Sequence, residues 1–315
     1  MKKKKSRIVL FIVLGLVALL GIWAAAQAIT LQSALKEADA RLKSYGAKVA
    51  DLPKGQMSYV DRGEGPTILV AHGISGGFDQ AYDAVAGKEN KYRVLAPSRF
   101  GYPGSDMPKD PSVKAQAAAY SELLDTLKIE QVYMLGTSAG GTPAIRFALD
   151  YPERCKGLIL YSSAMPETSP PQSVSGWQGP PPFTLNDFVM WSFRGLFSPM
   201  MGMDPDTIYS MLPIYSRKDG MKLDAQVTNP DMARNYDDYP IEEIACPVLI
   251  IGARDDKLVD VAAMEKAAPR FQNHRLLLFE SGGHLMEGHG HEVDAAMDEF
   301  IAEIEAKMTD EATLK

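Results

Sequence analysis

The chain has 315 residues, of which 46% are hydrophobic and 23% are charged, values that are ordinary for a globular protein. This composition excludes a wholly disordered chain, a collagen-like repeat and a polytopic membrane protein. Two cysteines are too few for a disulfide scaffold or a Cys-rich zinc module. The net charge is −7 although residues 1–7 (MKKKKSR) are strongly basic, so the rest of the chain is acidic. Nucleic acid is therefore not an expected partner, because its binding normally requires a basic face.

The chain begins with a membrane-directing segment. Ile8–Ala26 comprises 19 residues without a charge, and as a helix it would be roughly 28 Å long, close to the thickness of the hydrocarbon core of a bilayer. Residues 1–28 are either a retained signal anchor or a signal peptide, since Ala26-Gln27-Ala28 has the small-x-small pattern of a cleavage site. The long apolar run favours the anchor. In both cases Lys2–Lys5 stay in the cytoplasm, and the body is expected outside it, either membrane-attached or secreted.

Residues 29–55 form a predicted juxtamembrane stalk. Apolar residues recur there at helical spacing on one face, namely Leu31, Leu35, Ala38 and Leu42. Gly46 is a plausible end of this helix. The amphipathic pattern predicts a helix that lies on the membrane or the body, or a solvated spacer.

From Met57 onward, short apolar runs alternate with helical patterns. The predicted strands are Met57–Asp61, Thr67–Ala71, Arg93–Ala96, Gln131–Leu135, Gly157–Tyr161, Pro247–Ile251 and Arg275–Phe279. Helices are predicted to begin at Asp110 and after Gly140, and to cover Glu292–Lys307. Continuous apolar runs are typical of strands buried on both faces. Strands separated by helices favour an α/β fold with a doubly wound, mostly parallel sheet.

Residues 165–245 interrupt this alternation. They hold half of the 16 methionines and more than half of the 21 prolines, and they contain no strand pattern. Short helices are expected at Leu185–Phe197 and Asp206–Met211. We interpret the segment as a cap inserted over the sheet. Its methionines and aromatic residues are adaptable apolar surface, which suits either packing against the body or an apolar ligand.

A candidate nucleophile lies between a predicted strand and a predicted helix. Gly136-Thr137-Ser138-Ala139-Gly140 has the form G-x-S-x-G, and the strand–turn–helix context is the one that a nucleophile elbow requires. The turn is so tight that the serine adopts a strained backbone and its neighbours must be small. Ser138 is therefore predicted to present its hydroxyl above the sheet.

The candidate base and acid follow later in the chain. His284 comes after the last predicted strand and the turn Ser281-Gly282-Gly283, from which a histidine can reach the serine. Asp255 and Asp256 both come just after the predicted strand Pro247–Ile251. Either of them can orient the histidine. Glu287, His289 and His291 match no zinc-ligand pattern well, so no metal is expected.

Several of these segments resemble the α/β-hydrolase fold superfamily. The matching pieces are MSYVDRGEGPTILVAHG, VLAPSRFGYPGSDMP, GTSAGGTPAIRFALDYPERCKGLIL, CPVLIIGARDDKLV and ESGGHLMEGH. The resemblance implies a core formed by residues 56–164 and 246–308, with the cap at 165–245 and a tail at 309–315. It also implies the triad Ser138, Asp256 and His284. Asp256 is preferred to Asp255 because it lies four residues before Asp260, which occupies the place of a proline common in similar proteins.

The resemblance carries further implications for the site. One oxyanion donor should be the backbone N–H of Ala139, and the other the N–H of Ile74, after His72-Gly73. His72 itself is expected to shape the loop. Cys155 and Cys246 begin two strands that are neighbours in the superfamily, and in an exported protein they could form a disulfide. No cofactor is implied.

The expected function is that of a serine hydrolase acting through an acyl-enzyme. A carboxylesterase on small to medium apolar esters is the leading hypothesis. The same triad also suits carbon–carbon hydrolysis, thioester or peptide cleavage and acyl transfer, and a non-catalytic ligand-binding protein of the same fold is the rival class. Ser138 argues against a haloalkane dehalogenase or an epoxide hydrolase, because the enzymes of those two classes that have a similar fold use an aspartate nucleophile.

Overall fold

The computed structural model describes the backbone of residues 2–313 and the side chains of residues 8–310. Its centre is an eight-stranded sheet in the order β1-β2-β4-β3-β5-β6-β7-β8. The strands are β1 Lys48–Leu52, β2 Gly55–Arg62, β3 Thr67–Ala71, β4 Arg93–Pro97, β5 Val132–Thr137, β6 Cys155–Tyr161, β7 Val248–Ala253 and β8 His274–Phe279. All seven predicted strands are present, and the six from β4 to β8 in this order run parallel.

Helices cover both faces of the sheet. They are α2 Phe78–Asp83, α3 Val113–Thr126, α4 Gly141–Asp150, α10 Val261–Ala267 and α11 Gly290–Thr313. Leu69 and Ala71 of β3 pack into one apolar layer with α3 and α4. Ile68 and Val70 pack into the other with α2 and α11. Burial on both faces explains why this strand is a continuous apolar run, and the predicted α/β-hydrolase architecture is confirmed.

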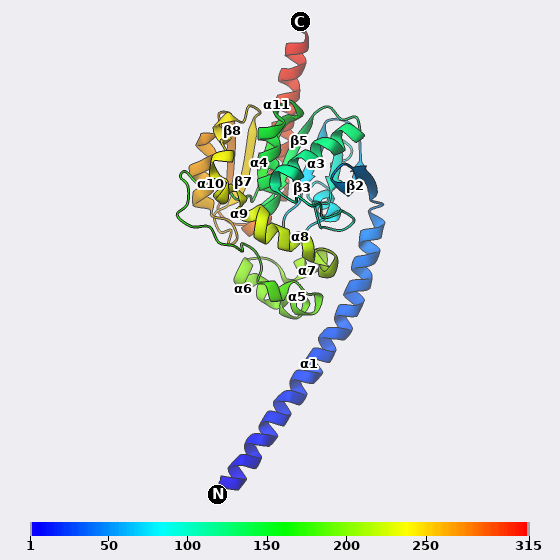
Figure 1. Ribbon diagram of the computed structural model, residues 1–315, viewed down its shortest axis with the longest axis vertical. Helices are drawn as coiled ribbons and strands as arrows, with labels where there is room; N and C mark the ends of the chain where they lie inside the picture. The colour runs from blue at the N-terminus through cyan, green and yellow to red at the C-terminus, as the bar shows by residue number, and fades with distance from the viewer. Residues whose placement is uncertain (1, 314–315) are drawn as a thin grey trace.

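Between β6 and β7, the described chain contains helices, turns and irregular loops but no strand. They include α5 Asp187–Phe193, α6 Phe197–Met201, α7 Ile208–Met211, α8 Lys218–Leu223, a π-helical turn at Asp224–Thr228 and α9 Asn229–Arg234. This is the segment predicted as the cap at 165–245. In Figure 1 it lies at one end of the body, opposite the end from which α11 projects.

The N-terminal segment differs from the prediction of separate anchor and stalk. A single helix, α1, runs unbroken over Lys2–Ser44. Its apolar part is exposed and extends beyond the body, as Figure 1 shows in blue. The predicted stripe lies on the body: Leu31 and Ala38 are buried with cap residues, and Leu42 packs against the core.

Three elements have other bounds in the structure than the sequence predicts. Strand β1 lies within the predicted stalk. It is an edge strand that pairs antiparallel with β2, and its alternating exposure leaves no continuous apolar run to predict it from. Helix α3 begins at Val113, where the Ser112 side chain accepts a hydrogen bond from the Ala115 N–H; Asp110 instead accepts from the Ser112 N–H. The predicted tail is helical as far as Thr313, and residues 314–315 lie outside the described residues.

Candidate active site

Ser138 lies at the carboxyl end of the central strand β5, where the chain turns into α4. Its φ is +51°, a left-handed conformation that costs a non-glycine residue about 1–3 kcal/mol. Such strain persists only where the surrounding contacts impose it. The serine is half-buried, directly before the short helical turn that leads into α4. This is the geometry of a nucleophile elbow.

Two glycines let the turn pack tightly. A Cβ on Gly140 would lie 2.0 Å from the carbonyl oxygen of Ala71, and a Cβ on Gly136 would lie 2.7 Å from Ala144 Cβ. Neither distance is compatible with a side chain. The glycine positions of the motif are therefore set by backbone approach between β5, α4 and the end of β3.

His284 and Asp256 come together from the loops that follow β8 and β7. His284 Nδ1 lies 2.8 Å from Asp256 Oδ2, and the two side chains are 7% and 0% exposed. The other oxygen, Oδ1, accepts hydrogen bonds from the Leu258 and Val259 N–H groups. The carboxylate is thus held from the backbone side and directed at the imidazole, which fixes which ring nitrogen carries the proton.

Asp255 has a different set of contacts. Its carboxylate accepts from the N–H groups of Gly282 and Gly283, at 3.3 and 2.8 Å. It therefore holds the glycine turn that carries His284, while Asp256 contacts the ring. Ser162, just past β6, donates from its hydroxyl to the His284 carbonyl at 2.7 Å. The geometry favours Asp256 as the partner of the histidine.

Ser138 and His284 lie in loops at the same edge of the sheet, after the parallel strands β5 and β8. Among residues 2–313, no hydrogen bond joins the serine Oγ to the imidazole. Catalytic hydrogen bonds are often long in an unliganded enzyme and tighten when substrate binds. The structure thus places the acid–histidine pair in contact and the serine on the neighbouring elbow.

The loop after β3 lies directly against Ser138. A Cβ on Gly73 would lie 3.1 Å from Ser138 Cβ, so the backbone at Gly73 borders the serine. His72 is buried and shapes the loop: its Nε2 accepts from the Arg99 N–H, and its Nδ1–H donates to the Gly73 carbonyl. Burial and the Arg99 charge hold the pKa of His72 well below its ordinary value. A neutral histidine with both nitrogens engaged is a structural part of the loop.

A buried ion pair joins this loop to the cap. Arg99 donates from Nη2 to Asp224 Oδ2 at 2.6 Å and from Nε to the His72 carbonyl at 2.9 Å. Asp224 also accepts from the Tyr102 hydroxyl. Burial lowers the pKa of Arg99, but the Asp224 charge outweighs it, so the net pKa is raised and the guanidinium stays charged. No local sequence pattern reveals this pair, because its residues are 125 positions apart.

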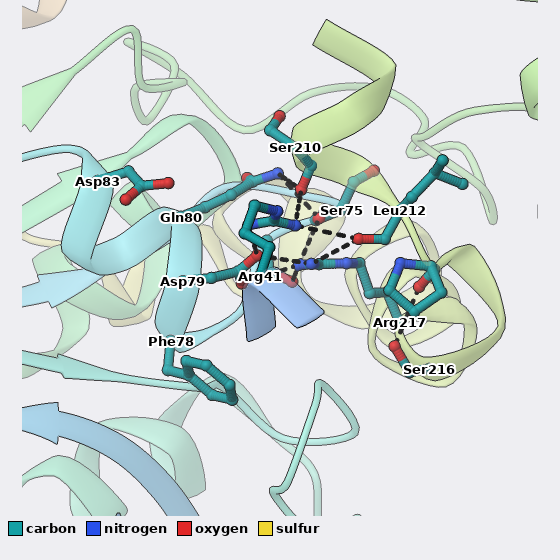
Figure 2. Close-up of polar contacts among 12 residues, drawn as sticks. Arg41, Ser75, Phe78, Asp79, Gln80, Asp83, Ser210, Leu212, Ser216 and Arg217 are labelled. Atoms are coloured by element: carbon teal, nitrogen blue, oxygen red, sulfur yellow. Dashed lines mark hydrogen bonds and ion pairs between the residues drawn. The ribbon is translucent and has the colours of Figure 1, made fainter. Parts of the chain in front are cut away.

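A second buried junction joins the cap, the core and α1. Asp79, in α2, is paired with Arg217 of the cap and with Arg41 of α1, each at 2.7 Å. Figure 2 shows the carboxylate between the two guanidinium groups. Arg217 also donates to the carbonyls of Ser75 and Gly76, next to Ile74. Burial raises the pKa of Asp79, but the two arginines more than reverse this and hold it below its ordinary value.

The remaining sequence candidates lie away from this constellation. The His289 ring stacks on Phe279, with 4.1 Å between ring centres. Cys155 and Cys246 are free thiols with their sulfur atoms 3.6 Å apart. The structure therefore brings the cysteines together, as the resemblance implied, without a bond between them. Among the described residues, no group of three or more His, Cys, Asp or Glu side chains is placed to hold a metal ion.

Comparison with known proteins agrees with the fold. Residues 66–286 match the family model for the alpha/beta hydrolase fold. Since the match covers more than half of the chain, the protein belongs to the α/β-hydrolase fold family.

Several of its relatives are named as hydrolases. The chain is 29% identical to an uncharacterized hydrolase, YcgS, of Bacillus subtilis over 253 residues, which is 74% of this chain and 89% of that protein. It is 25% identical to a 2-hydroxy-6-oxononadienedioate/2-hydroxy-6-oxononatrienedioate hydrolase of Paraburkholderia xenovorans, over 78% of this chain and 91% of the relative. A bacterial membrane phospholipase A has a similar solved structure, with a TM-score of 0.64, 18% identity, and coverage of 95% of this chain and 99% of the other. The protein is a hydrolase.

Proposed function

We propose that the protein is a serine carboxylesterase that acts on apolar esters through Ser138, His284 and Asp256. The observation that carries the proposal is the 2.8 Å contact between His284 and Asp256 beside a serine on a strained elbow. A serine hydroxyl is a weak nucleophile, and a neighbouring base is what activates it. The Asp256 carboxylate stabilises the imidazolium that forms when His284 accepts the serine proton.

The proposed reaction has two halves. Ser138 Oγ attacks the ester carbonyl, and His284 takes the serine proton. The N–H groups of Ala139 and Ile74 stabilise the oxyanion, at about 3–4 kcal/mol for a donor. When the intermediate collapses, the bond to the alcohol breaks and His284 protonates the leaving oxygen. Water then attacks the acyl-enzyme by the same path and releases the acid.

An apolar, uncharged substrate is favoured because two buried arginines near the site are already paired with aspartates. Arg99 and Arg217 contact the loop that contains Ile74, and each is already paired with a buried aspartate. A relative is named as a hydrolase of a dicarboxylic compound, which makes carbon–carbon hydrolysis the second candidate. Neither arginine is free to bind a carboxylate of such a substrate, so we rank the ester above it.

We further propose that α1 anchors the enzyme in a membrane, with the N-terminus cytoplasmic and the catalytic body outside. The helix contains an apolar window of mean hydropathy 2.9, none of it buried. The cap contacts Gln27 and Thr30, so the helix is part of the folded body beyond the candidate cleavage site at Ala28. Mass spectrometry of the membrane-bound protein tests this: a chain that begins at Ile29 would establish the secreted alternative.

Hydrolysis of nitrophenyl esters of graded chain length tests the esterase. The full chain in detergent should hydrolyse them, and Ser138→Ala should lose at least about 10³-fold in kcat, because the residual rate comes from binding and the oxyanion donors alone. Ser198→Ala is the matched control, since that serine is exposed on the cap. A fluorophosphonate should label wild type and not Ser138→Ala. No ester hydrolysis together with no labelling would favour the ligand-binding alternative.

A further inference from the structure

The end of the apolar part of α1 coincides with the cap. The run of apolar residues ends at Ala26, and the next residue, the polar Gln27, accepts a hydrogen bond from the Arg194 guanidinium at 3.1 Å. Trp191 donates from Nε1 to the hydroxyl of Thr30, also at 3.1 Å. Because a helix rises 1.5 Å per residue, these cap residues lie within a few ångströms of the level at which α1 would leave a bilayer.

The helix is fixed to the body over several turns. Leu31, Ala34 and Ala38 are buried against Trp191, Phe197 and Ile208 of the cap. Farther along α1, Arg41 pairs with Asp79 and donates to the carbonyls of Ser210 and Leu212, as Figure 2 shows. A helix held at both ends of this contact cannot swing away from the cap. The orientation of the cap toward the membrane is therefore set by α1.

The cap presents apolar side chains at this end of the molecule. Residues 188–203 (FVMWSFRGLFSPMMGM) contain one charge, Arg194, and its guanidinium lies over the Trp191 ring at 4.0 Å. Three large apolar side chains of this stretch are exposed: Phe193, Leu196 and Met200, the last at 67%. An arginine at the level where a helix leaves a membrane is typical of the interface.

This part of the cap contacts the loops that carry Asp256 and His284. The Pro199 carbonyl accepts from Lys257 Nζ at 3.3 Å, and the Gly202 carbonyl lies 3.3 Å from where a Cβ of Gly283 would be. Leu258 and Leu285, one residue from Lys257 and His284 respectively, are themselves exposed. α6 thus lies beside the turn that carries His284, and exposed apolar side chains are present on both.

We infer that the surface formed by Phe193, Leu196, Met200, Leu258 and Leu285 rests in the headgroup–acyl boundary of the bilayer that α1 enters, and that the enzyme takes its ester substrate from that bilayer. The inference rests on the anchor and the esterase proposed above. It commits to a lipid surface because the apolar side chains continue from an exposed helix of membrane-spanning length. An amphipathic surface of this kind inserts about 5–10 Å into the boundary.

Fluorescence quenching by lipids with brominated acyl chains tests the location directly. The full chain, carrying Cys246→Ser, is labelled with an environment-sensitive fluorophore at one introduced cysteine and reconstituted in phosphatidylcholine vesicles. Leu16→Cys reports the anchor, Leu196→Cys and Met200→Cys report the surface, and Met308→Cys is the control on the exposed helix at the opposite end. Labels at 16, 196 and 200 should be quenched about twofold, because they lie within reach of the acyl chains, and the label at 308 should not.

Each outcome decides a separate statement. Quenching at 16 without quenching at 196 and 200 would overturn the inference and leave the anchor intact. No quenching at 16 would overturn the anchor and the inference with it. Shielding of 196 by a second copy, seen as a cross-link between two chains without quenching, would replace the bilayer by a dimer.

A kinetic arm tests the source of the substrate. Leu196→Ser/Met200→Ser should hydrolyse a soluble nitrophenyl acetate at the wild-type rate but lose about tenfold on a long-chain ester presented in vesicles, because the loss of two inserted apolar side chains weakens contact with the bilayer. Val49→Ser, at an exposed apolar position on β1, is the control. Equal rates on the vesicle ester would overturn the inference. Absence of Ser138-dependent hydrolysis would instead concern the esterase, and the quenching result would stand.

Discussion

The core half and the cap half of the site are held by different forces. On the core side, β5 and α4 approach so closely that glycines are required at Gly136 and Gly140. On the cap side, two buried aspartates hold arginines across the boundary: Asp224 with Arg99, and Asp79 with Arg217. Steric fit fixes the turn at Ser138, whereas charge pairs fix the cap to the core.

The difference matters because the two kinds of contact respond differently to change. A close-packed turn resists any added atom but is insensitive to pH and salt. A buried ion pair contributes little net stability, yet removing one partner leaves an uncompensated charge and is strongly destabilising. The cap is therefore expected to be the part of the site that single charge-removing substitutions release most easily.

The largest effect is expected for the acid beside His284. Asp256→Asn should lower kcat about 10⁴-fold, because an amide can no longer hold the reactive tautomer or stabilise the imidazolium. Asp255→Asn should cost about tenfold or less, since that carboxylate contacts only the N–H groups of the turn. Nitrophenyl butyrate hydrolysis measures both. A greater loss in Asp255→Asn than in Asp256→Asn would reverse the assignment.

The charge-based attachment of the cap predicts the next largest effect. Asp79→Ala should destabilise the protein by about 3–5 kcal/mol, because Arg217 and Arg41 lose their common partner in a buried site. Urea unfolding of the full chain in detergent measures this, and limited proteolysis shows whether the cap is released first. Asp83→Ala, one turn farther along α2, is the control, because Asp83 is exposed and contacts only the Tyr45 hydroxyl. Similar stability of the two variants would contradict the comparison.

The close packing of the core half predicts a smaller loss of stability, confined to the turn at Gly140. Gly140→Ala should cost up to about 3 kcal/mol, because its Cβ meets the Ala71 backbone, which has no room to move. Gly195→Ala is the matched control, since a Cβ there meets no atom within 4 Å. Thermal unfolding compares the two. Equal melting temperatures would show that the elbow has more space than the contacts indicate.

The smallest effect concerns the neutral His72 that links the two halves. Its pKa is depressed in the folded protein, so below about pH 6.5 the unfolded chain binds a proton that the folded chain does not. Stability from this group is present above pH 6.5 and falls, as the pH is lowered, by at most about 1.4 kcal/mol per pH unit. Unfolding free energies from pH 7 to 5 should show a shallower slope in His72→Gln, and an unchanged slope in the control, exposed His291→Gln.

The sequence predicted the core half well because its signals are local. Seven strands are predicted from short, mostly apolar runs, and the tight turn at Ser138 is predicted from a pentapeptide between a strand and a helix. The structure also brings His284 to Asp256, which is the pair preferred from sequence. These residues could be found because each follows directly from the end of a strand.

The cap half was predicted only as an inserted segment. Asp79, Arg41 and Arg217 lie in three elements separated by up to 176 residues, and no local spacing relates them. The continuity of α1 was missed for another reason: an apolar run and an amphipathic run have different patterns, although a helix can pass from one to the other without a break. Long-range charge pairing and helix continuity are properties of the packed chain.

The continuity of α1 has a consequence for how the enzyme meets its substrate. With residues 8–26 in a bilayer, no hinge separates the membrane from Arg41. The catalytic body therefore cannot change its orientation relative to the membrane, as it could on a flexible linker. Its height is constant, and it searches by lateral diffusion in a plane. For a substrate dissolved in the same bilayer, this confinement raises the local concentration of enzyme and substrate together, and turnover should follow the surface density of the ester rather than its bulk concentration.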